Sequence, residues 1–382
     1  MIYLDNAATS WPKPPEVIRA MVQLLERAGG NPGRSGHDLS IEAGKKVYNT
    51  RELIAKLLNA PDPLRIIFTL NATHAINLAL SGMLKPGDRV VTSGMEHNSV
   101  IRPLRALEHK GVEVKTARCS CEGVMDLVEL KNLANAGAKL IVINAASNVT
   151  GTIQDIREAA KITHNAGALI LVDTAQTAGV LDIDMQEMDI DLLAFSGHKG
   201  LLGPTGTGGL IIGSNVDTSE IEPIFYGGTG SKSEFAEQPE SLPDKFESGT
   251  PNSVGIAGLG AGISFVMDMG VSKIREQEIK LTQALIDGLS SIQRVKVYGT
   301  GNANNSTAIV SFTIDGMQVS DVGLKLMEDY GIMPRVGLHC APAAHKTIGT
   351  FPNGTVRFAP GVFTSMEEIT QAIEAVEKIT RR

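Results

Sequence analysis

The sequence has 382 residues, of which 42% are apolar and 20% charged, and its formal net charge at pH 7 is −7. These proportions are ordinary for a soluble globular protein, and the length suits one large domain with a smaller one. The acidic balance without a basic run argues against a nucleic-acid partner. No apolar run approaches the ~20 residues of a membrane helix and no segment resembles a signal peptide, so no membrane partner is expected.

The cysteine content points to a reducing compartment. Cys119, Cys121 and Cys340 are too few for a disulfide framework. We therefore predict a cytoplasmic protein. Cys119 and Cys121 have no further Cys or His ligands beside them in the sequence, so we interpret them as structural and predict no metal site.

The chain begins with a short entry segment followed by two predicted helices. Trp11–Pro15 is rich in proline and predicts a rigid turn that starts a helix over 16–28. Glycines and prolines predict an exposed loop over 29–40. A second amphipathic helix follows and is predicted to end at Pro61-Asp-Pro63.

From Arg65 onward, apolar runs and amphipathic segments alternate. This alternation predicts a mostly parallel sheet with helices on both faces. The predicted strands cover 65–70, 89–92, 113–116, 138–144, 168–173, 190–196 and 208–212, and the predicted helices cover 71–80, 99–109, 126–135 and 155–166.

The last part of the chain predicts a second, smaller domain. Residues 227–244 are polar and weakly patterned, which predicts a loop or hairpin. Gly255–Gly262 follow no strand, so we predict a closely packed helix over 254–269 and no dinucleotide site. A long helix near 271–290 leads to predicted strands over 295–298, 307–314 and 355–360 and helices over 320–330 and 366–380.

The most informative stretch is the glycine-rich turn Ser196-Gly-His-Lys199. Lys199 could be a phosphate clamp, a surface residue or a covalent anchor, and the P-loop pattern fails because Gly200 follows it. Asp173 ends a predicted buried strand, at the sheet edge where open α/β folds bind ligands, although it could also cap the next helix. Pyridoxal phosphate needs a lysine for a Schiff base and an acid facing its pyridinium nitrogen. The Lys199 and Asp173 pair favours that cofactor.

These motifs together resemble a known family. Asp173-x-x-Gln176 with Ser196-Gly-His-Lys199 resembles the class V aminotransferase-like, fold-type I enzymes. Leu4–Thr9 and Arg335–Ala341 are similar to the cysteine desulfurases, and the second segment resembles their Suf-type (group II) branch. The resemblance covers nearly the whole chain. It implies an α/β fold in which residues 15–262 form a large domain with a mostly parallel sheet between helices, and 1–14 with 263–382 form a smaller α+β domain.

The resemblance also implies how the cofactor pyridoxal 5'-phosphate is held. His97 would stack on the ring and transfer protons, Asn148 would contact cofactor and substrate, and Gln176 would donate to the phenolic oxygen. Each could otherwise be a turn former or a strand-end polar group. The residues that resemble phosphate ligands are Thr73, His74, Ser196 and His198, with Thr250 from the other subunit of a homodimer. Thr73 and His74 begin a predicted helix, where an anion is favoured, although a plain helix cap would look similar.

Two residues of the second domain complete the expected site. Cys340 lies in a loop that contains glycine and proline and is predicted to be exposed, and Arg335 and His339 could favour its thiolate. Arg357 matches the arginine that pairs with the substrate carboxylate, although it could be a surface residue. The implied activity converts L-cysteine to L-alanine and leaves a persulfide on Cys340 for a sulfur-acceptor protein, as in iron–sulfur cluster biogenesis. A selenocysteine lyase, an aminotransferase, a kynureninase-like enzyme and a non-enzymatic protein on the same scaffold remain alternatives.

Overall fold

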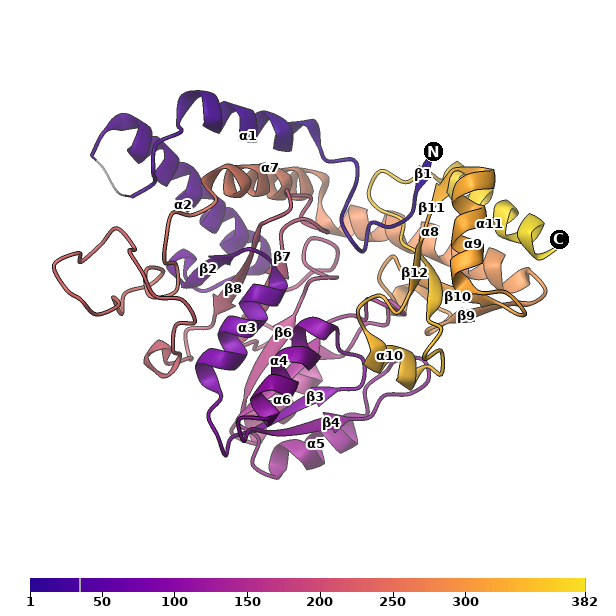
Figure 1. Cartoon of the computed structure of the whole chain (residues 1–382), viewed down its shortest axis with the longest axis horizontal. Helices are drawn as coiled ribbons and strands as arrows, with labels where there is room; N and C mark the ends of the chain where they lie inside the picture. Colours follow the sequence, from indigo (N-terminus) through magenta and orange to yellow (C-terminus); the bar gives the residue numbers. More distant parts are fainter. Residues whose placement is uncertain (34–35, 382) are drawn as a thin grey trace.

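The computed structural model describes residues 1–33 and 36–381 and is shown in Figure 1. The indigo-to-salmon part of the chain contains a seven-stranded sheet with helices on both faces, and the orange-to-yellow part forms a smaller sheet with its own helices. The predicted α/β class is confirmed. The limits proposed for the two domains stay a prediction.

The two N-terminal helices are α1 (Pro15–Arg27) and α2 (Asp38–Leu58), which confirms the predicted first helix. The loop predicted over 29–40 ends earlier, because a ring nitrogen of His37 accepts the backbone N–H of Ser40 and caps α2. Residues 34 and 35 of that loop lie outside the described residues. Asn59, in the left-handed region, ends α2 before the prolines are reached.

The large sheet has the order β2-β8-β7-β6-β5-β3-β4. Its five strands from β7 to β4 are parallel, and β8 runs antiparallel to β2 and β7, which confirms a mostly parallel sheet. The bounds are β2 (Ile66–Thr69), β3 (Arg89–Ser93), β4 (Glu113–Ala117), β5 (Leu140–Asn144), β6 (Leu169–Asp173), β7 (Leu192–Ser196) and β8 (Gly208–Ile212).

Helices cover both faces of this sheet, as predicted. Strand β5 is buried throughout, and its side chains alternate between the two faces of the sheet. Leu140 and Val142 belong to the core on one face, and Ile141 and Ile143 belong to the core on the other face. The first core also contains α3 (Ala72–Met83) and α4 (Asn98–Glu108). The second contains α2, α5 (Leu127–Asn135), α6 (Ile156–Asn165) and α7 (Ser253–Met269).

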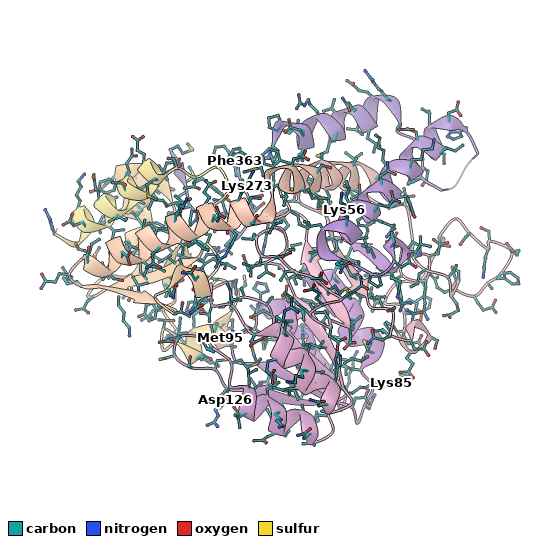
Figure 2. All side chains as sticks on the ribbon, turned by 180° about the vertical axis from the view of Figure 1, so that it is seen from behind. Lys56, Lys85, Met95, Asp126, Lys273 and Phe363 are labelled. Carbon is teal, nitrogen blue, oxygen red and sulfur yellow. The ribbon has the colours of Figure 1, made fainter. Side chains whose placement is uncertain are left out.

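Small residues let α7 pack closely, as predicted. A Cβ on Gly260 would lie 2.5 Å from the Thr50 hydroxyl of α2, and one on Gly262 would lie 2.5 Å from the carbonyl oxygen of Leu201. Among the described helices, none alone is long and apolar enough to span a membrane. Helices α7 and α8 (Val271–Ser291) pass that test only as a pair bent by 79°. Figure 2 labels Lys273 at the start of α8, and it also labels Phe363, whose ring packs on Phe265 of α7 with centroids 5.8 Å apart.

The smaller sheet is antiparallel, with the order β12-β13-β10-β9, and α8, α9 and α11 share its core. Strand β1 pairs in parallel with β11, so the N-terminus joins this part of the molecule (Figure 1). The remaining elements are β1 (Ile2–Tyr3), β9 (Val295–Tyr298), β10 (Val310–Ile314), α9 (Val319–Tyr330), β11 (Ile332–Met333), β12 (Arg335–Gly337), α10 (Pro342–Thr347), β13 (Thr355–Phe358), α11 (Met366–Thr380) and the 3-10 turns η1 (Pro63–Arg65), η2 (Thr218–Glu220) and η3 (Ala303–Asn305).

Two predicted strands are shorter than expected, because their ends bond to other segments. Thr307 donates its N–H to the Gly151 carbonyl, so β10 begins only at Val310, and Ala359 donates to the Leu4 carbonyl beyond the end of β13. Residues 227–244 form an irregular loop, as predicted. Cys119 is half-buried against the core, whereas Cys121 is exposed, so the structural interpretation is wrong for Cys121.

Candidate active site

A cavity of about 260 Å³ lies where the carboxyl ends of β5, β6 and β7 meet the starts of α3 and α4. This is the sheet edge at which open α/β folds bind ligands. The cavity brings together eight of the predicted site residues, which are Thr73, His97, Asn148, Asp173, Gln176, Ser196, His198 and Lys199.

Lys199 follows a turn that requires glycine at position 197. Gly197 donates to the Thr207 carbonyl, and a Cβ there would lie 2.2 Å from the Thr207 hydroxyl oxygen. Burial lowers the pKa of Lys199 to about 8; the attraction of Asp173 opposes this shift and the charge of Arg357 adds to it. At pH 7 about a tenth of the amine is therefore neutral and nucleophilic, far more than for an ordinary lysine.

The N-terminal segment clamps the peptide that precedes Lys199, which the sequence did not reveal. The His198 carbonyl accepts the backbone N–H of Ser10 (3.0 Å), and the Thr9 and Ser10 hydroxyls each lie 3.2 Å from it. The Lys13 ammonium also donates to it, at 2.9 Å. Burial lowers the pKa of Lys13 to about 8. Four donors thus converge on one carbonyl beside the cavity.

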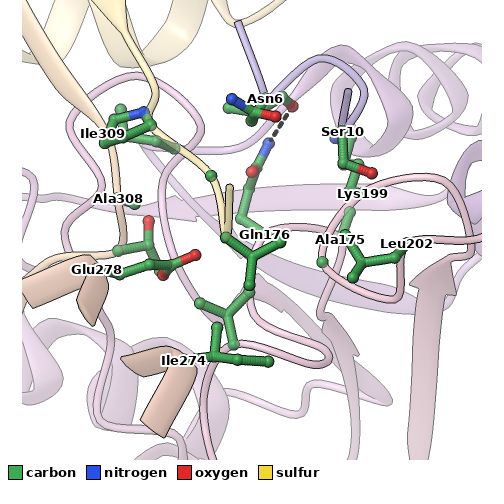
Figure 3. A pocket seen from close by; sticks show the side chains of 17 residues that line it. Asn6, Ser10, Ala175, Gln176, Lys199, Leu202, Ile274, Glu278, Ala308 and Ile309 are labelled. Carbon is green, nitrogen blue, oxygen red and sulfur yellow. Dashed lines mark hydrogen bonds between the residues drawn. The ribbon is translucent and has the colours of Figure 1, made fainter. Parts of the chain in front are cut away.

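A second, smaller cavity of about 50 Å³ is also lined by Lys199 (Figure 3). Gln176 and Lys199 border both cavities, and the amide of Gln176 donates to the Ala7 carbonyl (3.1 Å). Glu278 of α8 also lines the smaller cavity, and burial raises the pKa of its carboxyl to about 8. The N-terminal segment and α8 therefore border the site next to Lys199.

Asp173 and His97 are joined by Ser99, a residue that the sequence did not single out. The Ser99 hydroxyl lies 3.0 Å from Nδ1 of His97 and 3.5 Å from Oδ2 of Asp173. Because Nδ1 also accepts the Ser99 backbone N–H (3.0 Å), the neutral ring carries its proton on Nε2. Burial, reinforced by Lys199, lowers the pKa of His97 to about 4, while burial raises that of Asp173.

Glu96 supports the loop under His97 and was also missed from sequence. Its Oε1 accepts the Ser93 hydroxyl (2.5 Å) and the Asn144 backbone N–H (3.1 Å). Burial raises its pKa to about 8. The acidic side chain next to His97 is therefore largely protonated at neutral pH.

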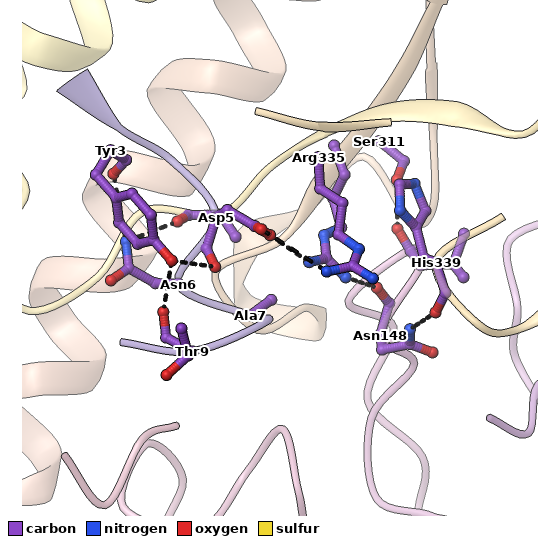
Figure 4. A network of polar contacts seen from close by, with 12 residues as sticks. Tyr3, Asp5, Asn6, Ala7, Thr9, Asn148, Ser311, Arg335 and His339 are labelled. Atoms are coloured by element: carbon purple, nitrogen blue, oxygen red, sulfur yellow. Dashed lines mark hydrogen bonds and ion pairs between the residues drawn. The ribbon is translucent and has the colours of Figure 1, made fainter. Parts of the chain in front are cut away.

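Arg357 is bonded to Asn148, one of the residues that line the cavity, and Figure 4 shows Asn148 with Asp5 and Arg335 in the surrounding polar network. Arg357 is 2% exposed, and its Nη1 donates to the Asn148 carbonyl (2.9 Å) while its Nη2 donates to Asp5 (2.7 Å). Arg335 lies 3.9 Å from the other oxygen of Asp5. Within the part of the chain that the structure describes, Nε of Arg357 and Oδ1 of Asn148 are buried without a hydrogen-bond partner. One donor and one acceptor thus remain for a small polar ligand.

Cys340 is exposed, as predicted, and its turn is bonded to two loops of the cavity. The Asn98 N–H donates to the Cys340 carbonyl (2.8 Å), and the Asn148 amide donates to the His339 carbonyl (2.7 Å). The prediction that a charged His339 favours the thiolate form of Cys340 is wrong. Burial, reinforced by Arg357, lowers the pKa of His339 to about 2, so its ring carries no charge at neutral pH.

Two predicted ligands lie outside the Lys199 cavity within one chain. His74 and Thr250 border a separate cavity of about 150 Å³, where the ring of His74 packs edge-on against Phe225 with centroids 5.3 Å apart. Thr250 is exposed and accepts a hydrogen bond from Asn31 (3.3 Å). Their contacts with the cofactor stay predictions.

The cavity fits the predicted cofactor. A lysine amine and a buried carboxylate line the same space, as the aldehyde and the pyridinium nitrogen of pyridoxal phosphate require. At the start of α3, Thr73 and Ala72 line the cavity, where free N–H groups and the helix dipole favour a phosphate. Nδ1 of His198, buried and without a partner among the described residues, adds one more polar atom.

Comparisons with known proteins show which family this chain belongs to. A family model described as aminotransferase class V matches residues 2–372. A probable cysteine desulfurase from Methanothermobacter thermautotrophicus is 37% identical over 99% of this chain and 94% of its own length, and one from Pyrococcus abyssi is 35% identical over 100% and 94%. The apo structure of a cysteine desulfurase from Thermococcus onnurineus NA1 covers 100% of this chain and 94% of its own, with a TM-score of 0.93 and 35% identity.

The fold and the site therefore define a class V aminotransferase-type protein, a member of a family of enzymes that depend on pyridoxal phosphate. Within that family, the chain belongs to the cysteine desulfurases. The family resemblance seen in the sequence is confirmed, whereas the Suf-type branch stays a prediction.

Proposed function

We propose that this protein is a pyridoxal-phosphate-dependent cysteine desulfurase that converts L-cysteine to L-alanine and accepts the sulfur atom on Cys340. The observation that carries the proposal is the attachment of the Cys340 turn to the Lys199 cavity through Asn98 and Asn148. An aminotransferase or a kynureninase-like enzyme would need no thiol at that place. The attachment therefore favours a desulfurase.

The cavity residues divide into those that hold the cofactor and those that act on the substrate. When bound, pyridoxal phosphate supplies an electron sink for the substrate Cα. The residues that would hold it are Lys199 by a covalent link, Asp173 at the pyridinium nitrogen, His97 on the ring, Gln176 at the phenolic oxygen, and Thr73, Ser196 and His198 at the phosphate.

Lys199 and Arg357 would act on the substrate directly. The Lys199 amine, with its pKa near 8, moves the proton at Cα when it is free. Arg357 binds the α-carboxylate, since a buried guanidinium with an unused N–H favours an anionic partner. Asn148, which accepts from Arg357 through its carbonyl, lies between the carboxylate site and the cofactor site.

The sulfur step needs no external oxidant. The Cys340 thiolate forms an S–S bond with the substrate sulfur while the Cβ–S bond of the substrate breaks. The electron pair of the broken bond stays with the substrate carbon, which takes up a proton. L-cysteine and the Cys340 thiol thus become L-alanine and a Cys340 persulfide.

The test is alanine formation from L-cysteine by a Cys340→Ser variant. Turnover should collapse while the visible absorbance of the bound cofactor remains, because no proposed cofactor contact comes from that turn. Cys121→Ser, which removes the other exposed thiol, should behave like the wild type. Wild-type turnover by Cys340→Ser would reject Cys340 as the acceptor, and transamination of a keto acid by the wild type would reject the desulfurase function.

We also propose a homodimer in which Thr250 completes the cofactor site of the partner subunit. The exposed position of Thr250, away from the Lys199 cavity of its own chain, supports this arrangement. Light scattering should give about twice the chain mass of 40.5 kDa. A monomer with full cofactor occupancy would contradict the arrangement.

The resemblance of the Arg335–Ala341 segment, which carries Cys340, supports the Suf-type branch. In this proposal a separate sulfur-acceptor protein comes to the exposed thiol, in the reducing cytoplasm. Alanine formation at limiting reductant should rise when the correct acceptor is added. Cell fractionation tests the location.

A further inference from the structure

The turn that carries Cys340 has a backbone conformation that its neighbours must hold in place. His339 (φ 47°) and Cys340 (φ 57°) both lie in the left-handed region, which residues other than glycine seldom adopt. Two successive residues of this kind persist only where the surroundings fix them. The N–H of Ala341 closes the turn on the Leu338 carbonyl at 2.8 Å.

One set of contacts holds the backbone of the turn. Asn98 and Asn148 donate to the carbonyls of Cys340 and His339, at 2.8 and 2.7 Å (Figure 4 shows the second contact). These bonds tie the turn to the large sheet but leave the side chain of His339 free to be used otherwise.

The second set of contacts runs through the buried imidazole of His339. Its Nε2 lies 3.0 Å from the Thr355 hydroxyl, which donates to the Ser311 hydroxyl (3.2 Å), which in turn donates to the Val149 carbonyl (2.6 Å). A carbonyl can only accept, so the direction of the whole chain is fixed. His339 must therefore donate from Nε2, so in the neutral ring the proton sits on that nitrogen.

We propose that His339 is a positioning residue for the sulfur step: its Nε2–H bond to Thr355 fixes the turn from which the Cys340 thiol projects. The ring is 4% exposed and is neutral at neutral pH, so it contributes a directed hydrogen bond and no charge. Thr355 and Ser311 are fully buried, and they carry the position of His339 to β13 and β10 of the smaller sheet.

The inference predicts that the donor matters and the imidazole itself does not. His339→Phe keeps an aromatic ring without the donor, whereas the amide of His339→Gln can still donate to Thr355. We expect kcat for alanine formation to fall about 10- to 100-fold in His339→Phe, the size of effect that a small misplacement of a reacting group produces. His339→Gln should stay within about threefold of the wild type, and KM should change by less than about twofold in both.

A second pair of variants guards against a folding defect at His339. Thr355→Val has nearly the shape of threonine but lacks the hydroxyl, and Thr355→Ser keeps it. Thr355→Val should lower kcat as His339→Phe does, with KM and the visible absorbance of the holoprotein unchanged, and Thr355→Ser should restore it. Equal kcat in both members of this pair would overturn the proposal.

Alkylation of Cys340 by iodoacetamide separates position from charge. In a Cys121→Ser background, Cys119 interferes little, because burial raises its pKa to about 11. The pH midpoint of Cys340 alkylation should be the same with His339 and with His339→Gln. A shifted midpoint would mean that the imidazole acts through charge, which contradicts the proposal.

This inference rests on the proposed function, and the two can fail separately. Full turnover by Cys340→Ser would overturn both. An inactive Cys340→Ser variant beside fully active His339→Phe and Thr355→Val variants would overturn only the role of His339.

Discussion

Two buried aspartates lie at opposite ends of the large sheet, Asp191 just before β7 and Asp173 at the end of β6. They differ in how many hydrogen bonds they accept. At the amino end, Asp191 precedes β7 and accepts from the Ile170 N–H (2.7 Å), from His164 (2.9 Å) and from the Asn215 amide. At the carboxyl end, Asp173 accepts one short bond, from the Ala175 N–H (2.9 Å), and a long one from Ser99 (3.5 Å).

The same contrast extends to the neighbouring polar atoms. Glu96, Asn144, Asn148 and His198, all around the cavity, each have a buried polar atom without a partner among the described residues. Asn31, Thr282 and His345 also carry such atoms, but they do not line this cavity. Buried polar groups in proteins are normally paired, so four unpaired atoms around one cavity indicate atoms held ready for a ligand. The paired polar groups at the amino end of the sheet stabilise the fold, whereas the unpaired groups at the carboxyl end lower stability and remain available to bind a ligand.

The largest effect should come from Lys199→Ala. Removing the amine removes both the covalent attachment and the base at Cα, so alanine formation should fall by at least ~10²–10⁴-fold. Borohydride treatment should fix the pyridoxyl group on Lys199 of the wild type and on no residue of the variant. Lys56→Ala, at an exposed position of α2 (Figure 2), is the matched control. An adduct on any other lysine would reject the assignment.

The paired substitutions Asp173→Asn and Asp191→Asn sharpen the comparison directly. Asp173→Asn should lower kcat by ~10²–10³-fold, because an amide cannot balance a cationic ring nitrogen. Its folding stability should not fall, because burial disfavours the charged form of Asp173. Asp191→Asn should cost about 1–3 kcal/mol in the free energy of unfolding, because it weakens a buried hydrogen-bond network. Its kcat per folded molecule should be unchanged. Denaturant titration measures the stability and the alanine assay measures kcat. A stability loss without a kcat loss in Asp173→Asn, or a kcat loss without a stability loss in Asp191→Asn, would contradict the contrast between the two acids.

A smaller effect is expected from Lys13, whose ammonium clamps the His198 carbonyl. A charged hydrogen bond of this kind contributes about 1.5–3 kcal/mol, so Lys13→Ala should lower kcat by about 10-fold or more. Lys13→Arg retains a cationic donor and should recover most of the activity. Because the pKa of Lys13 is about 8, the gap between wild type and Lys13→Ala should narrow above pH 8. A gap that stays constant up to pH 10 would show that the charge is irrelevant.

The smallest effect concerns His164, between Asp189 and Asp191. Burial opposes protonation of His164, but hydrogen bonds and charge from the two acids outweigh it and raise its pKa. A raised histidine pKa adds stability below the unfolded value near 6.5, and this stability is lost as pH rises through the folded value. His164→Gln should therefore lower Tm more at pH 5 than at pH 9. The exposed His109→Gln serves as control, and an equal loss at both pH values would contradict the assignment.

The parts of the fold that the sequence predicted are those with a repeating local pattern. The buried runs of β5 and β6 and the long helices α8 and α11 were placed to within about two residues of their observed ends. Strands β1 and β11 have two residues each, and they exist only because Ile2 pairs with Ile332. No local pattern can reveal a strand whose partner lies so far along the chain.

The site divides in the same way. Asp173, Ser196 and Lys199 were predictable, because they sit at the ends of recognisable strands or in a distinctive motif. Lys13 was not, since its bond to His198 spans 185 residues. A partial signal existed in the proline-flanked lysine, but nothing local indicated its partner.

The measurement that tests the central claim most directly is a map of where sulfur goes in a single turnover. The holoenzyme would be mixed with a limited amount of L-cysteine, all thiols and persulfides alkylated, and the peptides analysed by mass spectrometry. The account predicts one additional sulfur atom on the peptide that contains Cys340, in proportion to the alanine formed, and none on the peptide with Cys119 and Cys121. Alanine formed with free sulfide and no sulfur on Cys340, or with the sulfur on Cys121, would contradict it.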